Sequence, residues 1–137
     1  MVSPARPPAP GAVLGLGIDL VEISRFRESL ARFGARLEQR LFTAGEKAYC
    51  EQTAPAHRAQ HFAARFAAKE AWIKASGIGL CWTEIEVVNQ PGTGAPELRL
   101  HGRTAAAARD AGIGRVLLTL THAGDLAIAH VMTLGSG

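Results

Sequence analysis

The longest helical pattern in the chain runs from Phe62 to Ser76, where alanine dominates and neither glycine nor proline occurs. At about 100° per residue, Phe62, Phe66 and Ile73 fall on one face. Small residues fill the opposite side, at Ala63, Ala64, Ala67, Ala68, Ala71 and Ala75. Because both large sides can pack against other elements, this pattern predicts a deeply buried central helix.

Three charged residues interrupt the apolar character of this helix. Lys69 projects within the stripe of Phe62 and Ile73, and Glu70 and Lys74 flank it one turn apart. Buried charges are costly unless they are paired or bind something. The conflict between packing and charge therefore indicates a site.

The N-terminal half also contains a strand and further helices. Residues 13–21 alternate between apolar side chains and Gly15, Gly17 and Asp19, which predicts a strand. Because two of those positions carry no side chain, we expect another element to approach this backbone closely. Ser24 is the expected N-cap of a second helix, and Thr43 opens a third with capping-box spacing.

The C-terminal half changes to strand patterns. Residues 84–88 and 97–101 flank a loop rich in turn residues, and residues 115–121 and 126–133 flank a second turn, so each pair predicts a hairpin. An alanine-rich helix is expected at residues 103–111. Helices early and hairpins late favour an α+β fold with a mostly antiparallel sheet packed against the long central helix.

Composition bounds the class of protein. With 137 residues, 47% of them hydrophobic and 20% charged, the chain fits one globular domain, expected at residues 12–137. Residues 1–11 are proline-rich and are expected to form a disordered extension rather than a signal peptide. No apolar run approaches the ~20 residues of a membrane span. Cys50 and Cys81 lack CxxC spacing, which favours free thiols in a reducing cytoplasm.

Two carboxylates on separate elements suggest a metal site. Asp19 ends the glycine-bearing face of the first strand, and Glu70 lies on the central helix. Mg²⁺ commonly takes one or two protein carboxylates and completes its shell with waters and phosphate oxygens. Arg65, Lys69 and Lys74 could neutralise such phosphates. The alternative is a simple ion pair between Glu70 and Lys74, with Asp19 as a turn residue.

A basic segment spans residues 24–40, with five arginines against two glutamates. Arg25, Arg32 and Arg36 share one helical face if the helix continues through Gly34. This face is either simply solvated or a docking surface for an acidic partner, which a net charge of +3 also favours. Interleaved aromatic residues for base stacking are missing, which argues against single-stranded nucleic acid.

Histidine occurs five times in the chain. His122 follows an apolar strand and is either a turn residue or part of a site at a strand end. The others are expected to be structural or surface residues: His57, His61, His101 and His130.

Three segments together resemble one enzyme family. They are Gly15-Leu-Gly-Ile-Asp-Leu-Val-Glu-Ile-Ser-Arg-Phe26, Arg65-Phe-Ala-Ala-Lys-Glu-Ala-Trp-Ile-Lys-Ala75 and Leu118-Thr-Leu-Thr-His122. In residues, order and separation they are similar to the holo-(acyl-carrier-protein) synthases, the small bacterial 4'-phosphopantetheinyl transferases. The resemblance covers residues 13–133.

The resemblance implies a reaction, in which phosphopantetheine moves from coenzyme A to a serine of apo acyl-carrier protein and adenosine 3',5'-bisphosphate leaves, as part of fatty acid biosynthesis. It implies that Asp19 and Glu70 bind Mg²⁺ and that Glu70 and Lys74 act in catalysis. It implies that coenzyme A is bound by Arg65, Lys69, Lys74 and His122. It implies that the acidic carrier protein docks on Arg25, Arg32 and Arg36, and that the protein is a homotrimer with active sites between subunits. Neither nucleic acid nor a membrane is an expected partner.

Two other classes of function remain open. A non-enzymatic module could bind an acidic protein or RNA through the arginine face, without any role for Asp19. A Mg²⁺-dependent phosphohydrolase could use the same carboxylates and would cleave coenzyme A without a carrier protein. The preferred carrier protein and the general base are likewise open.

Overall fold

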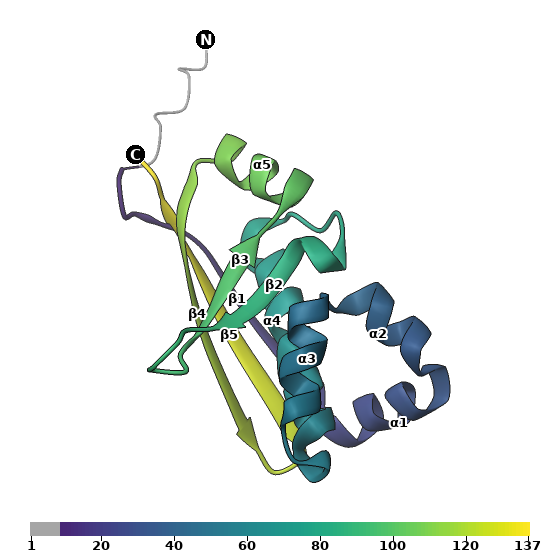
Figure 1. Ribbon diagram of the computed structural model, residues 1–137. Coiled ribbons are helices and arrows are strands. Elements are labelled where there is room, and N and C mark those ends of the chain that lie inside the picture. Colours follow the sequence, from purple (N-terminus) through teal and green to yellow (C-terminus); the bar gives the residue numbers. More distant parts are fainter. Residues whose placement is uncertain (1–8) are drawn as a thin grey trace.

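The computed structural model describes residues 9–137. The larger of its two sheets forms the centre of the fold. This sheet has three antiparallel strands in the order β1 (Val13–Glu22), β5 (Leu126–Gly135) and β4 (Ile113–Ala123). The long helix α4 (Arg58–Ser76) lies across one face of it (Figure 1). The helix is longer than predicted because one more turn precedes Phe62.

A second, two-stranded sheet lies on the far side of α4 from β1. It consists of β2 (Ile85–Asn89) and β3 (Pro96–Leu100), and α5 (Gly102–Asp110) follows it (Figure 1). Both predicted hairpins are present, with ends that differ by one or two residues from the sequence pattern. The α+β prediction with antiparallel sheets is confirmed.

Three helices and two short 3-10 turns complete the chain. They are α1 (Ile23–Phe33), α2 (Ala35–Leu41), α3 (Ala44–Gln52), Pro55–His57 and Trp82–Glu84. The predicted capping box of Thr43 and Glu46 is present. Ser24 is not an N-cap, because α1 already begins at Ile23, and Ser24 instead donates to Asp125 beside the β4–β5 turn. A positive φ of 56° at Gly34 separates α1 from α2.

Helix α4 and β1 approach each other backbone to backbone. A Cβ placed on Gly15 or Gly17 would lie 1.9 Å from the Ala75 carbonyl oxygen or 2.0 Å from that of Ala71. The prediction that another element approaches the glycines is confirmed, and that element is the central helix. This contact brings the segment of β1 from Gly15 to Asp19 beside the last turns of α4.

The core lies along both sides of α4. Phe62, Ala67, Ala71 and Trp72 are completely buried, as the two packable faces predict. Aromatic rings from α1, the end of α2 and α4 pack together around one end of the helix, with Phe26 stacked on Phe66 at 5.3 Å. The helix is therefore held on all sides and is a rigid support for its charged residues.

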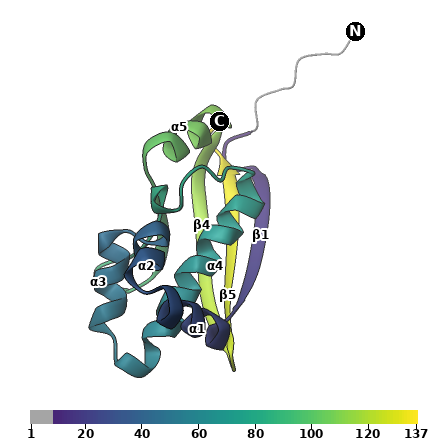
Figure 2. The same ribbon diagram turned by 90° about the vertical axis from the view of Figure 1, so that its right-hand side faces the viewer.

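The outer face of the three-stranded sheet is uncovered in residues 9–137, and it is apolar along β1. All described helices lie on the α4 side of this sheet (Figure 2). On β1, Leu16, Ile18 and Leu20 are each more than half exposed, at 56–59%. A row of exposed large aliphatic residues is unusual for a monomer.

Most of the expected extension, residues 1–8, lies outside the described residues. Gly11 donates to the carbonyl of Gly135 at 2.9 Å, so contact with the domain begins at or before this residue. Cys50 and Cys81 are both free thiols, as expected. Among residues 9–137, no helix combines the length and the apolar character needed to span a bilayer.

Candidate active site

Asp19, Glu70 and Lys74 converge where β1 meets α4. Lys74 Nζ donates to Asp19 Oδ1 at 2.8 Å and to the carbonyl of Ile18 at 3.3 Å. Its ion pair is therefore with the strand carboxylate, and the alternative of a simple Glu70–Lys74 pair is not what the structure shows. The Lys74 side chain is 55% exposed, so its ammonium group can also turn to a ligand.

Glu70 lies beside this pair, and the charges of Asp19 and Lys74 both act on its pKa. Burial raises the pKa of Glu70 above its usual value, the negative charge of Asp19 raises it further, and Lys74 opposes both. Two carboxylates that repel each other at a partly exposed position form a pair of oxygen ligands of the kind that Mg²⁺ prefers. Among residues 9–137 no third acidic, histidine or cysteine side chain joins them.

Lys69 does not face this cluster, although it precedes Glu70 in the chain. It is fully buried, and its Nζ donates to Glu46 Oε1 at 2.7 Å and to the carbonyls of Trp82 and Ile85. The expectation that Lys69 binds coenzyme A is wrong for this structure, because the ammonium group has neither exposure nor a donor to spare.

Arg65 and His122 meet in a second place, a pocket of about 210 Å³ between α4 and the end of β4. Arg65 is 2% exposed, donates from Nη2 to Asn89 Oδ1 at 2.6 Å, and lies over the Tyr49 ring at 4.0 Å. His122 Nδ1 lies 3.2 Å from the side-chain amide nitrogen of Gln60. The sequence prediction that Arg65 and His122 share a site is consistent with this geometry.

The two places lie on different sides of α4. Glu70 follows Arg65 by five positions, which corresponds to about 140° around a helix axis. Arg65 faces α3 and β2, whereas Lys74 faces β1. One chain therefore presents two separate clusters rather than the single cluster that the sequence suggested.

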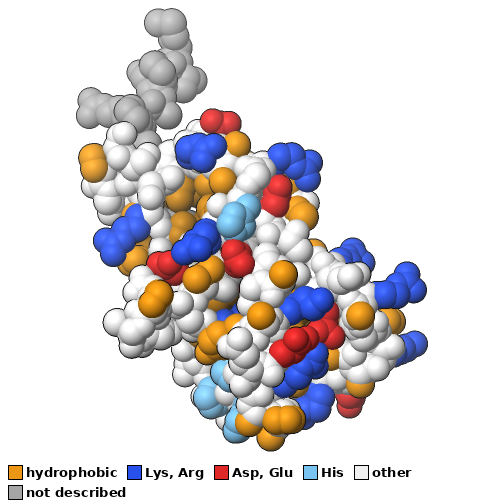
Figure 3. Space-filling view, in the orientation of Figure 1, with side chains coloured by type: hydrophobic (Ala, Val, Ile, Leu, Met, Phe, Trp, Pro, Cys, Tyr) orange, Lys and Arg blue, Asp and Glu red, His pale blue; other side chains and the backbone are white. Residues whose placement is uncertain are grey.

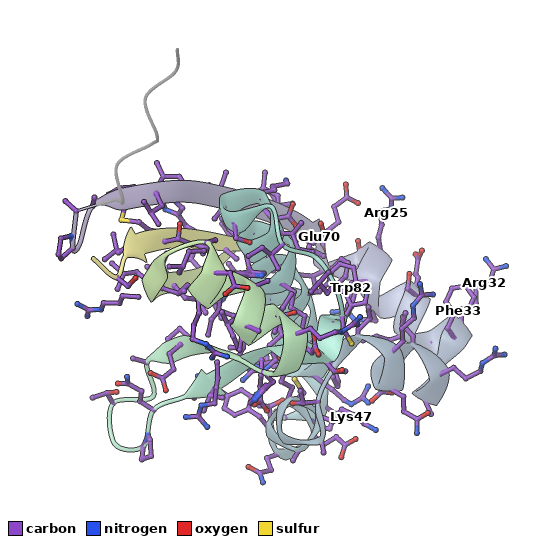
Figure 4. The ribbon with its side chains drawn as sticks, turned by 90° about the horizontal axis from the view of Figure 1, so that it is seen from above. Arg25, Arg32, Phe33, Lys47, Glu70 and Trp82 are labelled. Atoms are coloured by element: carbon purple, nitrogen blue, oxygen red, sulfur yellow. The ribbon has the colours of Figure 1, made fainter. Side chains whose placement is uncertain are left out.

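The arginine segment forms a shallow basic surface. Figure 4 shows Arg25, Arg32 and Phe33 projecting outward from α1, and Figure 3 shows Lys and Arg side chains along the outer edge of α1 and α2. The condition for one shared face fails, because the helix ends at Gly34. Arg32 and Arg36 nevertheless line one depression of about 460 Å³, together with Phe33, Leu37 and Arg40.

A protein-family model matches the part of the chain that contains these two clusters and the arginine surface. The model of the 4'-phosphopantetheinyl transferase superfamily matches residues 15–129, which include the β1–α4 cluster, the arginine surface and the pocket. The chain belongs to this superfamily.

Curated relatives of this transferase match most of the chain. A holo-(acyl-carrier-protein) synthase of Anaeromyxobacter dehalogenans is 48% identical over 130 residues, 91% of this chain and 98% of the relative. One of Geobacter metallireducens is 44% identical over 124 residues, 88% of this chain and 96% of the relative.

Solved structures agree with the fold of the transferase. The holo-(acyl-carrier-protein) synthase of Neisseria meningitidis superposes with a TM-score of 0.81 at 28% identity, covering 89% of this chain and 98% of that one. A complex of such an enzyme with coenzyme A, from Chronobacterium ammoniagenes, has a TM-score of 0.78 at 32% identity and covers 92% and 99%.

Sequence reasoning missed several residues of this transferase. Tyr49, Gln60, His61 and Asn89 line the pocket beside Arg65, and His61 was expected to be structural or on the surface. A helical signal existed, since His61 precedes Arg65 by four residues and so lies on the same side of the helix. Tyr49 and Asn89 come from other elements, and no local pattern marks them.

Proposed function

We propose that the protein transfers 4'-phosphopantetheine from coenzyme A to a serine of apo acyl-carrier protein in fatty acid biosynthesis. The products are the holo carrier protein and adenosine 3',5'-bisphosphate. The observation that carries the proposal is the convergence of Asp19, Glu70 and Lys74 at the β1–α4 contact, in a chain that belongs to the transferase superfamily. The names of the relatives and the coenzyme A complex of a structural neighbour support it.

The resident metal in this proposal is Mg²⁺, held by Asp19 and Glu70. The fit is chemical: within residues 9–137 no histidine or cysteine joins the two carboxylates, and carboxylate oxygens alone favour a hard cation that keeps its own waters and substrate oxygens. When bound, Mg²⁺ supplies positive charge next to the diphosphate of coenzyme A.

Lys74 and Glu70 have separate roles in the proposed transfer step. The serine oxygen forms a bond to the β-phosphorus, the phosphoanhydride bond breaks, and its electron pair stays on the departing adenosine bisphosphate. Lys74 would turn from Asp19 to stabilise this developing charge. The serine proton needs an acceptor, and Glu70 is our candidate, directly or through a water, because its pKa is raised by burial and by Asp19.

The carrier protein would dock on the basic surface of α1 and α2. Arg25, Arg32 and Arg36 remain the proposed contacts, and Arg40 joins them because it lines the same depression as Arg32 and Arg36. Complementary charge chiefly raises the association rate, so salt should weaken this encounter.

The finer proposal for assembly is a homotrimer with active sites between subunits, working in the cytoplasm. Its support is the uncovered row of Leu16, Ile18 and Leu20, which another copy of the chain could bury. The separation of the two clusters around α4 also favours it, because adjacent copies could combine one cluster from each. The two free thiols are consistent with a reducing compartment.

The test is a transfer assay with apo acyl-carrier protein, coenzyme A and Mg²⁺, read by intact-protein mass. We expect the carrier to gain the mass of one phosphopantetheine group, and excess chelator to abolish the gain until Mg²⁺ is restored. No gain, beside an active control enzyme, would overturn the proposal. Release of adenosine bisphosphate from coenzyme A without carrier would favour the phosphohydrolase alternative instead.

A further inference from the structure

The pocket between α4 and β4 has the chemistry of an anion site. Its polar lining consists of Tyr49, Gln60, His61, Arg65, Asn89 and His122, together with Thr121, and none of the lining residues is acidic. Histidine side chains gather at this lower end of the molecule in Figure 3. A pocket with cationic and neutral donors but no carboxylate suits a phosphate that binds without a metal.

Arg65 supplies the second observation. Its side chain is almost completely buried, yet Nε has no hydrogen-bond partner among the described residues. A buried guanidinium donor without an acceptor is costly, and a ligand oxygen would satisfy it. Nη2 is already held by Asn89, which fixes the direction of the group.

His61 lies four residues before Arg65 and packs edge-on against the Tyr49 ring at 5.5 Å. Burial lowers the pKa of His61 below its usual value, and the positive charges of Arg65, His57 and His122 lower it further. Arg65 lies on α4, His57 in the 3-10 turn before it and His122 near the end of β4, whereas Tyr49 comes from α3. The surroundings of His61 therefore favour the neutral imidazole, whereas a phosphate dianion beside it would favour the charged form.

We propose that His61 is a further substrate-binding residue, which joins Arg65 and His122 in holding the phosphate monoester of coenzyme A and takes up a proton as that phosphate enters. The inference rests on the proposed function for the identity of the ligand. Coenzyme A carries one diphosphate and one monoester, the 3'-phosphate. The carboxylate cluster suits the metal-bound diphosphate, which leaves the monoester for the pocket without carboxylates.

The test is calorimetric binding of adenosine 3',5'-bisphosphate and adenosine 5'-monophosphate at pH 7.5, in two buffers of different ionisation enthalpy. For the wild type we expect preference for the bisphosphate and net proton uptake. His61→Gln should bind the bisphosphate about tenfold more weakly and lose much of the uptake, while its affinity for the monophosphate changes little. His101→Gln is the matched control, since His101 is exposed, does not line the pocket and is not among the charges that act on His61.

An NMR titration of the histidine side chains in the wild-type protein tests the inference without any substitution. The His61 signal should titrate at higher pH when adenosine 3',5'-bisphosphate is present. An unchanged titration, or a His61→Gln variant with wild-type affinity and proton uptake, would refute the inference. Neither measurement requires turnover, so a transfer-active enzyme with these results would refute the role of His61 alone. A protein that shows the His61 effects without transfer would refute only the proposed function.

Discussion

Lys69 is fully buried, and each of its three hydrogen-bond contacts is to Glu46 or to a main-chain carbonyl. Glu46 in turn accepts from the main-chain nitrogens of Thr43 and Val87, so the pair ties α3, α4 and β2 together. The motif around Glu70 suggested a ligand role for Lys69, because nothing local in the sequence marks Glu46, 23 positions earlier, as its partner. The two adjacent charged residues of α4 therefore differ in role: Lys69 pairs with Glu46 inside the core, whereas Glu70 lies beside Asp19 and Lys74.

The first prediction at this scale concerns that buried pair. Lys69→Met should lower the free energy of unfolding by about 3–5 kcal/mol, because it leaves the Glu46 carboxylate buried without its cation. Urea unfolding followed by circular dichroism measures the change. Lys47→Met replaces a lysine of α3 that makes no ion pair within residues 9–137, and it should change the free energy of unfolding by less than about 0.5 kcal/mol. A loss below about 1 kcal/mol for Lys69→Met would contradict the structural role given to the pair.

At the scale of elements, the contact between β1 and α4 positions the proposed catalytic cluster. The sequence predicted both elements and the close approach at Gly15 and Gly17, because alternation and alanine content are local signals. It could not predict which element fills that space, or that Gly34 divides the arginine surface into two helices, because both depend on packing between distant segments. Asp19 and Glu70 are brought together by this packing alone.

Replacing Gly17 tests the contact. Gly17→Ala would place a Cβ 2.0 Å from the Ala71 carbonyl oxygen, so β1 and α4 must move apart. We expect a loss of stability of at least about 2–3 kcal/mol and reduced transfer, because Asp19 moves relative to Glu70. Gly92→Ala serves as a control, since its φ of 86° is strained for alanine but no atom lies within 4 Å of the added Cβ. It should cost about 1 kcal/mol, and equal losses in both variants would argue against the close contact.

At the scale of the whole molecule, residues 9–137 hold two clusters on different sides of α4 and leave one sheet face uncovered, which is apolar along β1. Family resemblance supplied the expectation of a trimer, and no composition or periodicity of the chain would have done so. The sequence predicted the strand β1 from its alternating pattern, but this pattern does not indicate which face of the strand stays uncovered. The separation of Glu70 and Arg65 supports the proposed assembly, because a site built from both residues of one chain would have to reach around the helix.

Mixed assemblies test this arrangement. Glu70→Gln and Arg65→Gln should each be poorly active, but co-expressed chains should recover part of the transfer activity, because some sites then combine an intact carboxylate cluster with an intact pocket from a neighbour. Differently tagged chains purified over both tags provide the sample, and light scattering reports its subunit number. A mixture no more active than the two variants measured apart would show that both clusters of a site come from one chain.

The central claim is that the Asp19–Glu70–Lys74 cluster performs phosphopantetheinyl transfer, and the most direct measurement compares two glutamate variants in the mass assay. Glu70→Gln should retain the fold by circular dichroism, but its transfer rate should fall by at least about 100-fold, because one of the two proposed metal-binding carboxylates is lost. Glu51→Gln, an exposed glutamate near the end of α3, should transfer at the wild-type rate. A folded Glu70→Gln protein that modifies the carrier as fast as the wild type would contradict the account.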